Sequence, residues 1–512
     1  MLTLTSVFRR ISSLAAFLAL FSLATFAQPA AAPDEVIVRA ADPATPFPHF
    51  WEQMFGSGRA ILSLRQSYRD DLRAVKQVTD FRYVRFHAIL LDELGVYNED
   101  EHGAPIYNFT YVDQVYDGLL ANGVRPVVEI GFMPQKLSAD SKAIHPFWYK
   151  QNVAPPKSWE RWDELIRRMA QNLVDRYGVD EASQWYFEVW NEPNIDFWAG
   201  DPKQPTYFEL YDHTARALKS VSGRLRVGGP ATAAASWIPD FLAHAAREHV
   251  PVDFVSTHGY ADDTVENLLG THEEIPYEQR LCRAVRKVRG VIDASPSPHL
   301  PLFWTETNVR GDHALRDTPY VGPALAESLR DCDGQVDAIS NWTFSDVFEE
   351  NGPALEPFIG QFGLRAMGGI NKPSYYDYAL LHQLGRQRLP ARKPSGAAAP
   401  GVLATRLPDG RLALAVWNLV PPEQQPHQRH VRLRLEGVPD NARVSVQRVD
   451  SRHGNVLPFY EKMGSPKMPT PAQAAELNRA SALGRPQRLR LHHGELPLEL
   501  EPNALVLIEV ER

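Results

Sequence analysis

The sequence predicts an α/β protein in which a (β/α)8 TIM barrel is followed by a C-terminal β-sandwich domain. From residue 50 to about residue 390, short apolar runs alternate with amphipathic stretches of helical period, which is typical of repeated βα units around a parallel sheet. There are about eight such runs, the number of strands in this barrel. Beyond residue 390 the pattern changes to closely spaced strands of alternating polarity, as in a compact β-sandwich.

The candidate barrel strands are short and rich in β-branched and aromatic residues. In chain order they are 54–59, 83–90, 125–132, 186–190, 226–229, 254–258, 302–305 and 339–344. Residues 111–124 and 159–178 place apolar side chains at helical spacing, and Gly123 and Gly178 supply C-terminal stops. The long segment 134–157 follows the third strand, so we expect it to lie over the face that carries the active site in barrel enzymes.

The first 32 residues are typical of an export signal peptide. Arg9 and Arg10 precede an apolar stretch at 14–26, and small residues follow it. This stretch is short for a membrane span, which needs roughly 20 apolar residues. We therefore expect cleavage near Ala27 or Ala32 and a periplasmic or secreted protein without stable membrane insertion.

The remaining segments complete the domain organisation. Residues 33–49 contain an alternating stretch at 35–40 that is expected to add a strand to the sandwich. The barrel is expected to occupy 50–390. A junction rich in Pro, Gly and Ala begins near Ala391, so the sandwich domain is expected to span 391–512.

Charge and composition exclude several classes of protein. The formal net charge is -8, and the 54 Lys and Arg residues are spread along the chain without basic runs, so no nucleic-acid partner is expected. With only Cys282 and Cys332, the chain is neither a disulfide scaffold nor a cysteine-based zinc site, and whether the two pair is left open. No HxxxH or HxH spacing suggests a metal site, so neither metal nor cofactor is expected. The oligomeric state is not predicted.

Two glutamates stand at the ends of candidate strands in aromatic surroundings. Glu192 lies in WYFEVWNEPN at the end of the fourth strand, and Glu306 lies in LFWTETN at the end of the seventh. The carboxyl ends of barrel strands share one face, so two residues far apart in the chain are expected to meet there. A single glutamate at a strand end is more often a structural ion pair, but a pair of carboxylates is what glycosidic bond hydrolysis usually requires.

Other polar and aromatic residues cluster at the same strand ends. Asn191, beside Glu192, can bond a sugar hydroxyl, and tryptophan and phenylalanine rings offer flat faces for a pyranose, although some of them must be core. The candidates are His87 after the second strand, Phe197, His258 and Tyr260 at the sixth, and Trp342, Asp346, Glu349 and Glu350 at the eighth, with Trp190, Trp198 and Trp304 as further rings. Each histidine alone is more often a hydrogen-bonded structural residue than a ligand.

The chain resembles glycoside hydrolase family 39, the β-xylosidase group, over nearly its whole mature length. The similar motifs are FRYVRFHAILLDELGVY, GLLANGVRPVVEIGFMP, WYFEVWNEPN, RVGGPAT, STHGY, WTETN and WTFSDVFEE, and the likeness continues into VQRVDSRHGNVLPFYEKMGSPKMPTPAQAAEL. The resemblance implies a metal-independent, retaining mechanism with Glu192 as acid/base and Glu306 as nucleophile. It also implies that the terminal sugar is bound by His87, Asn191, Phe197, His258, Tyr260, Trp342 and Glu350, with Glu349 as a neighbour.

Retention predicts carboxyl groups about 5 to 5.5 Å apart, and inversion predicts a wider gap that admits water. Two carboxylates so close repel, which raises the pKa of one of them. Which glutamate plays which part comes from the resemblance alone.

Three positions depart from the pattern of the relatives. Thr307 and Gly311 stand where many relatives carry an aromatic residue and a tyrosine after the nucleophile, and Asn341 replaces a tyrosine. Tyr260 and Arg310 are the candidates to orient the nucleophile instead. A shifted substrate preference would be one consequence.

The leading hypothesis is an exported glycoside hydrolase that takes part in xylan degradation by releasing xylose from the non-reducing ends of β-1,4-xylo-oligosaccharides. An alternative keeps the machinery and changes the sugar, as an α-L-arabinosidase or an α-L-iduronidase-like enzyme would, and Arg310 is then the cation that could meet a substrate carboxylate. A third alternative is a sugar-binding protein with weak or lost catalysis. The sandwich is expected mainly to pack against the barrel.

Overall fold

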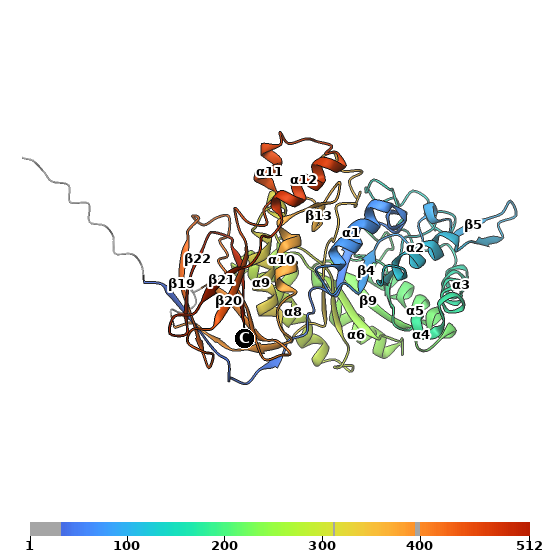
Figure 1. Ribbon diagram of the computed structural model, residues 1–512. Helices are drawn as coiled ribbons and strands as arrows, with labels where there is room; N and C mark the ends of the chain where they lie inside the picture. Colours follow the sequence, from blue (N-terminus) through green and yellow to red (C-terminus); the bar gives the residue numbers. More distant parts are fainter. Residues whose placement is uncertain (1–31, 311–312, 395–399, 512) are drawn as a thin grey trace, which may run out of the picture.

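Eight parallel strands close into a barrel, which confirms the predicted fold class (Figure 1). The strands are β3 Met54–Ser57, β4 Tyr83–Phe86, β7 Arg125–Ile130, β8 Tyr186–Val189, β9 Arg226–Thr232, β10 Phe254–His258, β11 Leu302–Thr307 and β12 Ala338–Asn341. They follow the chain around the barrel, and β12 pairs with β3 to close it. The structure, a computed structural model, describes residues 32–310, 313–394 and 400–511, so the expected export signal lies outside it except for its last residue.

Helices surround the barrel strands. They are α1 Gln66–Lys76, α2 Thr110–Leu120, α3 Trp159–Tyr177, α4 Val179–Ala182, α5 Lys203–Val221, α6 Ile238–Arg247, α7 Val265–Leu269, α8 Tyr277–Asp293, α9 Val321–Cys332 and α10 Pro373–Leu381. The apolar stripes predicted for α2 and α3 face inward and are largely buried. Ser158 caps α3 by accepting a hydrogen bond from Arg161 N, and Gly178, with a φ of 79°, ends the helix.

Several strands end earlier than the apolar pattern predicts. Strand β4 ends at Phe86 because the chain turns at Ala88, whose φ is 72°, and β8 ends at Val189 because Trp190 has a φ of 70°. Strand β12 likewise stops at Asn341, just before Trp342. Apolar residues continue past these ends because they pack in the loops of the C-terminal face, where period alone cannot separate strand from loop.

Two sheets form the sandwich, beside the barrel in Figure 1. The four-stranded sheet has the order β16-β1-β19-β22, and the seven-stranded sheet has the order β2-β15-β17-β18-β23-β20-β21. Their strands are β1 Asp34–Arg39, β2 Thr45–Pro46, β15 Gln387–Leu389, β16 Ala391–Arg392, β17 Gly401–Arg406, β18 Leu412–Trp417, β19 Arg429–Glu436, β20 Arg443–Val449, β21 Gln487–Arg490, β22 Glu495–Leu500 and β23 Leu505–Val510. Strand β1 pairs in parallel with β19. Strand β15 pairs with β17, so the sheet begins a few residues before Ala391, the expected start of the sandwich.

Short elements extend the strand ends. The hairpin of β5 Tyr97–Glu99 and β6 Pro105–Tyr107 follows β4, and the pair β13 Arg365–Ala366 and β14 Ile370–Asn371 follows β12. Two helices that the sequence analysis did not predict, α11 Leu457–Lys462 and α12 Pro471–Ser481, interrupt the sandwich between β20 and β21. They pack against β14 and reach the loop after β12, where the Tyr460 and Phe358 rings lie 4.8 Å apart.

One apolar cluster runs from the barrel helices into the sandwich. It includes Leu381 of α10 and Leu329 of α9 together with Trp417 of β18 and Leu505 of β23. A second cluster fills the space between the two sheets. No helix among the described residues is long and apolar enough to cross a membrane.

Candidate active site

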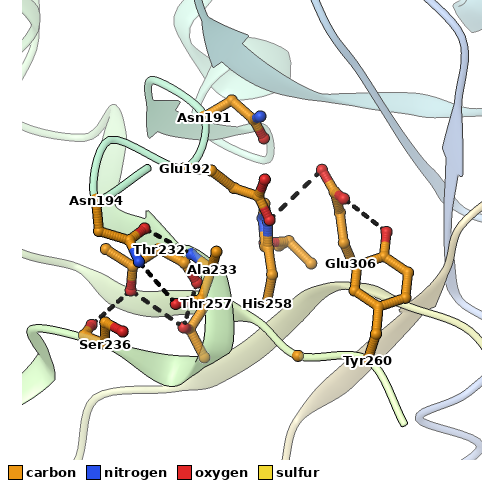
Figure 2. A network of polar contacts seen from close by, with 12 residues as sticks. Asn191, Glu192, Asn194, Thr232, Ala233, Ser236, Thr257, His258, Tyr260 and Glu306 are labelled. Carbon is orange, nitrogen blue, oxygen red and sulfur yellow. Dashed lines mark hydrogen bonds and ion pairs between the residues drawn. The ribbon is translucent and has the colours of Figure 1, made fainter. Parts of the chain in front are cut away.

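Glu192 and Glu306 meet at the C-terminal face of the barrel although they lie far apart in the chain. Figure 2 shows the two carboxylates pointing toward each other, with His258 close to both. Glu306 lies within β11, whereas Glu192 lies three residues beyond the end of β8 and has a φ of 42°. A carboxylate oxygen of one approaches an oxygen of the other within 4.8 Å.

His258, at the end of β10, lies between the two carboxylates. Its Nδ1 is 3.0 Å from Glu192 Oε1 and 3.6 Å from Glu306 Oε1. Burial lowers the pKa of His258 to about 4, so the ring is neutral at neutral pH and adds no positive charge beside Glu192. Burial also raises the pKa of Glu192 to about 7. Glu192 can therefore hold a proton near neutral pH, as a general acid must.

Both oxygens of Glu306 are engaged by neighbouring donors. Arg85 of β4 donates from Nη1 to Glu306 Oε1 at 2.5 Å, and the Tyr260 hydroxyl donates to Oε2 at 2.8 Å (Figure 2 shows the tyrosine contact). Arg85 also donates from Nη2 to Asn191 Oδ1 at 2.9 Å. Charge-assisted hydrogen bonds of this kind fix the orientation of a carboxylate. Tyr260, one of the two residues that the sequence offered to orient the residue expected to be the nucleophile, thus bonds Glu306 directly.

Arg85 lies inside the barrel within a cluster of buried charges. It contacts Glu188 at 2.5 Å and Glu129 at 3.0 Å, and all three side chains are fully buried. His87 Nδ1 lies 2.5 Å from Glu129 Oε2. Burial opposes the charged form of His87, but the contact with Glu129 outweighs it and raises the pKa of His87 to about 10. Two positive charges thus face three carboxylates, Glu306 included, which offsets part of the cost of burying them.

The loop after β12 contributes Trp342 and Glu350 to the site, where both lie beside His87. Glu350 Oε1 lies 3.6 Å from His87 Nε2, and burial raises the pKa of Glu350 to about 7. The Trp342 ring lies 4.7 Å from the His87 ring. It fits there because residue 56 is glycine: a Cβ at Gly56 would lie 2.1 Å from the indole.

The segment 134–157 does reach this face, as predicted. His145 stacks on Phe197, with ring centroids 3.9 Å apart, and Phe147 packs edge-on against the same ring at 5.3 Å. Phe197 O accepts a hydrogen bond from the indole of Trp190 at 2.7 Å. Phe197, in the loop that follows Glu192, is therefore held by Trp190 through its backbone and by this insertion through its ring.

Some candidates from the sequence lie elsewhere. The Trp190, Trp198 and Trp304 rings are fully buried and serve as core. Glu349 is paired with Arg59 and Arg65. Asp346 pairs with buried Lys372 at 2.8 Å, in a network that holds the base of the loop that carries Glu350.

Two of the positions that depart from the relatives line one cavity beside β11, the strand that carries Glu306. Thr307 and Asn341 line a small cavity of about 50 Å³ between β11 and helices α8 and α9. Arg310, only 11% exposed, makes a bidentate ion pair with Glu423 of the sandwich at 2.5 and 2.9 Å. It makes no hydrogen bond or ion pair with Glu306, which is held by Tyr260 and Arg85 instead. Gly311 lies outside the described residues.

Two groups of histidine and carboxylate side chains are compact enough to hold a metal ion. One is Glu192, His258 and Glu306 itself, where the Arg85 guanidinium already supplies a cation. The other is His49, Glu52 and His382, which lies at the opposite end of the barrel because His49 and Glu52 precede β3. Both oxygens of Glu52 are bonded to these histidines, at 2.5 and 2.7 Å.

Sequence reasoning missed Arg85, Glu129 and Glu188. A signal was present: Arg85 lies in β4 and His87 directly follows it, two residues on and so on the same side, and each of the three charges stands among apolar residues of a barrel strand. Charged residues in such positions are buried only when paired.

The arrangement is suited to glycosidic bond cleavage with retention. One oxygen of each carboxylate lies within 4.8 Å of the other, which favours the close spacing of retaining enzymes over the roughly 6.5 to 9.5 Å between the carboxyl groups of inverting ones. One carboxyl carries a proton near neutral pH, and the other is held by Arg85 and Tyr260.

Known proteins resemble this chain along most of its length. A β-xylosidase of Geobacillus stearothermophilus is 37% identical over 477 residues, which cover 90% of this chain and 92% of the relative. The solved structure of a monomeric β-xylosidase from Caulobacter crescentus CB15 superposes with a TM-score of 0.82 at 34% identity, covering 93% of this chain and 99% of that one. An α-L-iduronidase of Canis lupus familiaris is 30% identical, but over only 34% of this chain and 27% of the relative.

The family model agrees with these relatives. The model of glycosyl hydrolases family 39 matches residues 34–487, which include the barrel and most of the sandwich. With this match, the carboxylate pair and the barrel that positions it, the chain belongs to glycosyl hydrolases family 39 and is a glycoside hydrolase.

Proposed function

We propose that this enzyme is a retaining, exo-acting β-xylosidase that releases xylose from the non-reducing ends of β-1,4-xylo-oligosaccharides and so takes part in xylan degradation. The observation that carries the proposal is the approach of Glu192 and Glu306 within 4.8 Å in a chain that matches β-xylosidases over about nine tenths of its length.

Glu306 is the nucleophile and Glu192 the acid/base. Glu306 attacks the anomeric carbon while Glu192 protonates the leaving oxygen, which gives a covalent glycosyl-enzyme. Glu192, now ionised, then removes a proton from water as the water attacks that intermediate. The neutral His258 beside Glu192 allows both protonation states of this carboxyl without a fixed counter-charge.

His87, Asn191, Phe197, Tyr260, Trp342 and Glu350 bind the terminal sugar. Support comes from their meeting around the carboxylate pair, where Asn191 and Glu350 present polar atoms and Phe197 and Trp342 present rings. Arg85 and Glu129 do not contact the substrate. Arg85 positions Glu306 and Asn191, and Glu129 positions His87, from inside the barrel.

The iduronidase-like alternative is the weaker one. An enzyme that binds the carboxylate of a uronic acid sugar needs a cation in its site. Arg310, the candidate for that part, is paired with Glu423, and the sequence likeness to α-L-iduronidases covers only 29 to 43% of the chain. The hypothesis of lost catalysis is weakened as well, because Glu306 is oriented by two donors despite Thr307.

Variants of the two glutamates test the assignment. With an aryl β-xyloside of good leaving-group ability, Glu306→Ala should lose activity, whereas Glu192→Ala should accumulate glycosyl-enzyme and be rescued by azide. A rate for Glu306→Ala equal to that of the wild type would overturn the nucleophile, and no azide rescue would overturn the acid/base. Aryl arabinosides and iduronides assayed alongside decide the sugar.

Export to the periplasm or the medium is part of the proposal. It rests on the signal-like segment of residues 1–32 and is consistent with the Cys282–Cys332 disulfide, since disulfides persist mainly in oxidising compartments. Fractionation of cells that express the full chain, with N-terminal sequencing of the product, would test it. Uncleaved protein in the cytoplasm would contradict it.

A further inference from the structure

Exposed apolar side chains gather on the loops that surround the carboxylate pair. Of the eight large apolar side chains exposed among the described residues, five belong to the loops that follow β7, β8 and β12. These are Ile144, Trp148, Ile195, Leu355 and Ile359. Exposed apolar groups concentrated on one face mark a binding surface more often than scattered ones do.

Trp148 is the largest of them, and it is held in place. Its backbone N–H donates to Glu350 O at 2.8 Å, and its ring lies over Gly352, where a Cβ would come within 3.3 Å of the indole. On either side of it, Phe147 packs on Phe197 and the Tyr149 ring lies 5.2 Å from the Arg59 guanidinium. Trp148 nevertheless remains 58% exposed. A fixed, uncovered indole is a flat surface ready for a ligand.

The exposure of the site residues shows where the substrate leaves the site. Glu306 and His87 are almost completely buried, whereas Glu192 and Glu350 keep 13% and 12% of their side chains exposed. Solvent therefore reaches the site past Glu192 and Glu350. Ile195 N donates to Glu192 O at 3.2 Å, so Ile195 borders this edge beside the acid, and Trp148 borders it beside Glu350.

We propose that Trp148 is the stacking platform for the leaving-group sugar, the xylose unit next to the one that is released. This inference rests on the proposed function and deepens it. The acid protonates the oxygen that joins the two sugars, so the second sugar must begin at Glu192 and extend over the solvent-facing edge. A pyranose has an apolar C–H face that packs on an aromatic ring, and an indole offers a large area at little entropic cost.

The test compares substrates with and without a second sugar. Trp148→Ala should lower kcat/KM on xylotriose by about tenfold, mainly through KM, which is the scale of losing one well-packed aromatic contact. The same variant should turn over β-xylosyl fluoride, whose leaving group is too small to reach the ring, within about twofold of the wild-type rate. Trp148→Phe should recover most of the xylotriose activity.

A matched control is Ile106→Ala, which removes an exposed apolar side chain from the β5–β6 hairpin at the edge of the molecule (Figure 1) and should change neither rate. An unchanged xylotriose rate in Trp148→Ala, or an equal loss on both substrates, would overturn the platform. If the wild type did not hydrolyse β-xylosyl fluoride, the proposed function would fail first and the platform with it. Turnover of the fluoride by the wild type therefore distinguishes a failure of the proposed function from a failure of the Trp148 platform.

Discussion

Glu192 and Glu306 are the same residue type in different surroundings, and this difference assigns their roles physically. Glu192 sits beyond the end of its strand beside a neutral histidine, and burial raises its pKa to about 7. Glu306 faces the guanidinium of Arg85 and the hydroxyl of Tyr260. The proton is therefore expected on Glu192, in agreement with the polarity that the family resemblance implies.

The pH dependence of the reaction follows from Glu192. Its carboxyl must be protonated to act as acid, so kcat/KM on xylo-oligosaccharides should fall as the pH rises above about 7. The measurement is a pH–rate profile for the wild type and for Glu192→Ala. The variant is assayed on an aryl β-xyloside whose activated leaving group needs no acid. The fall above pH 7 should disappear in the variant. A fall that persists would place the titrating group on Glu350, whose pKa burial also raises to about 7.

The individual site residues were predictable to different degrees. Glu192, Glu306, His87 and His258 stand within three residues of strand ends, and strand counting alone brings them to one face, whereas Glu350 lies farther along the loop after β12. Arg85 was missed because its partners Glu129 and Glu188 come from other strands and only the closed barrel pairs them. His145 was missed because it lies within an insertion whose path no periodicity specifies.

At the scale of elements, the strands were predictable in number and place but not in length. Turns at Ala88 and Trp190 end β4 and β8, and neither residue is of a type that usually adopts a positive φ. Helices α11 and α12 were missed because their short apolar stretches lie within a region dominated by strand patterns. The capping box of Thr470 and Gln473 was the available signal for α12.

The disulfide joins two such elements and answers the open question about the cysteines. Cys282 of α8 and Cys332 of α9 are bonded across a sequence separation of 50, and these helices precede and follow β11, which carries Glu306. Replacing both by serine should lower the free energy of unfolding by about 2 to 4 kcal/mol, because the unfolded chain loses a loop constraint. Thermal unfolding of the variant and of reduced wild type checks this. The two should unfold at the same temperature, below that of oxidised wild type, and equal stability of all three would contradict it.

At the scale of the whole molecule, barrel and sandwich share a core. The apolar cluster of the barrel helices continues into β18 and β23, and the Trp417 indole donates to Glu327 of α9 at 3.0 Å. The chain also crosses between the parts, since β1 and β2 precede the barrel and belong to the sandwich sheets. Alternating strand patterns predicted the sandwich, but which of its faces meets the barrel depends on packing that the sequence pattern does not encode.

A fragment limited to residues 50–390 should therefore not fold on its own. Removing the sandwich would expose the apolar surfaces of α9 and α10 that it covers, and aggregation is the expected result. Residues 33–512, the matched control, should be soluble and unfold cooperatively. Calorimetry of the two makes the comparison, and a barrel fragment that unfolds at the temperature of the control would show that the shared core is dispensable.

The central claim is that Glu192 and Glu306 hydrolyse a β-xyloside with retention. The most direct test follows xylotriose hydrolysis by proton NMR and records which anomer of which sugar forms first, before mutarotation. The close approach of the two carboxylates, with one oxygen of each within 4.8 Å of the other, predicts that β-xylose appears first and that xylobiose remains as the other product. Initial release of α-xylose would contradict the double displacement, and release of any other sugar or of no sugar would contradict the assignment of the substrate.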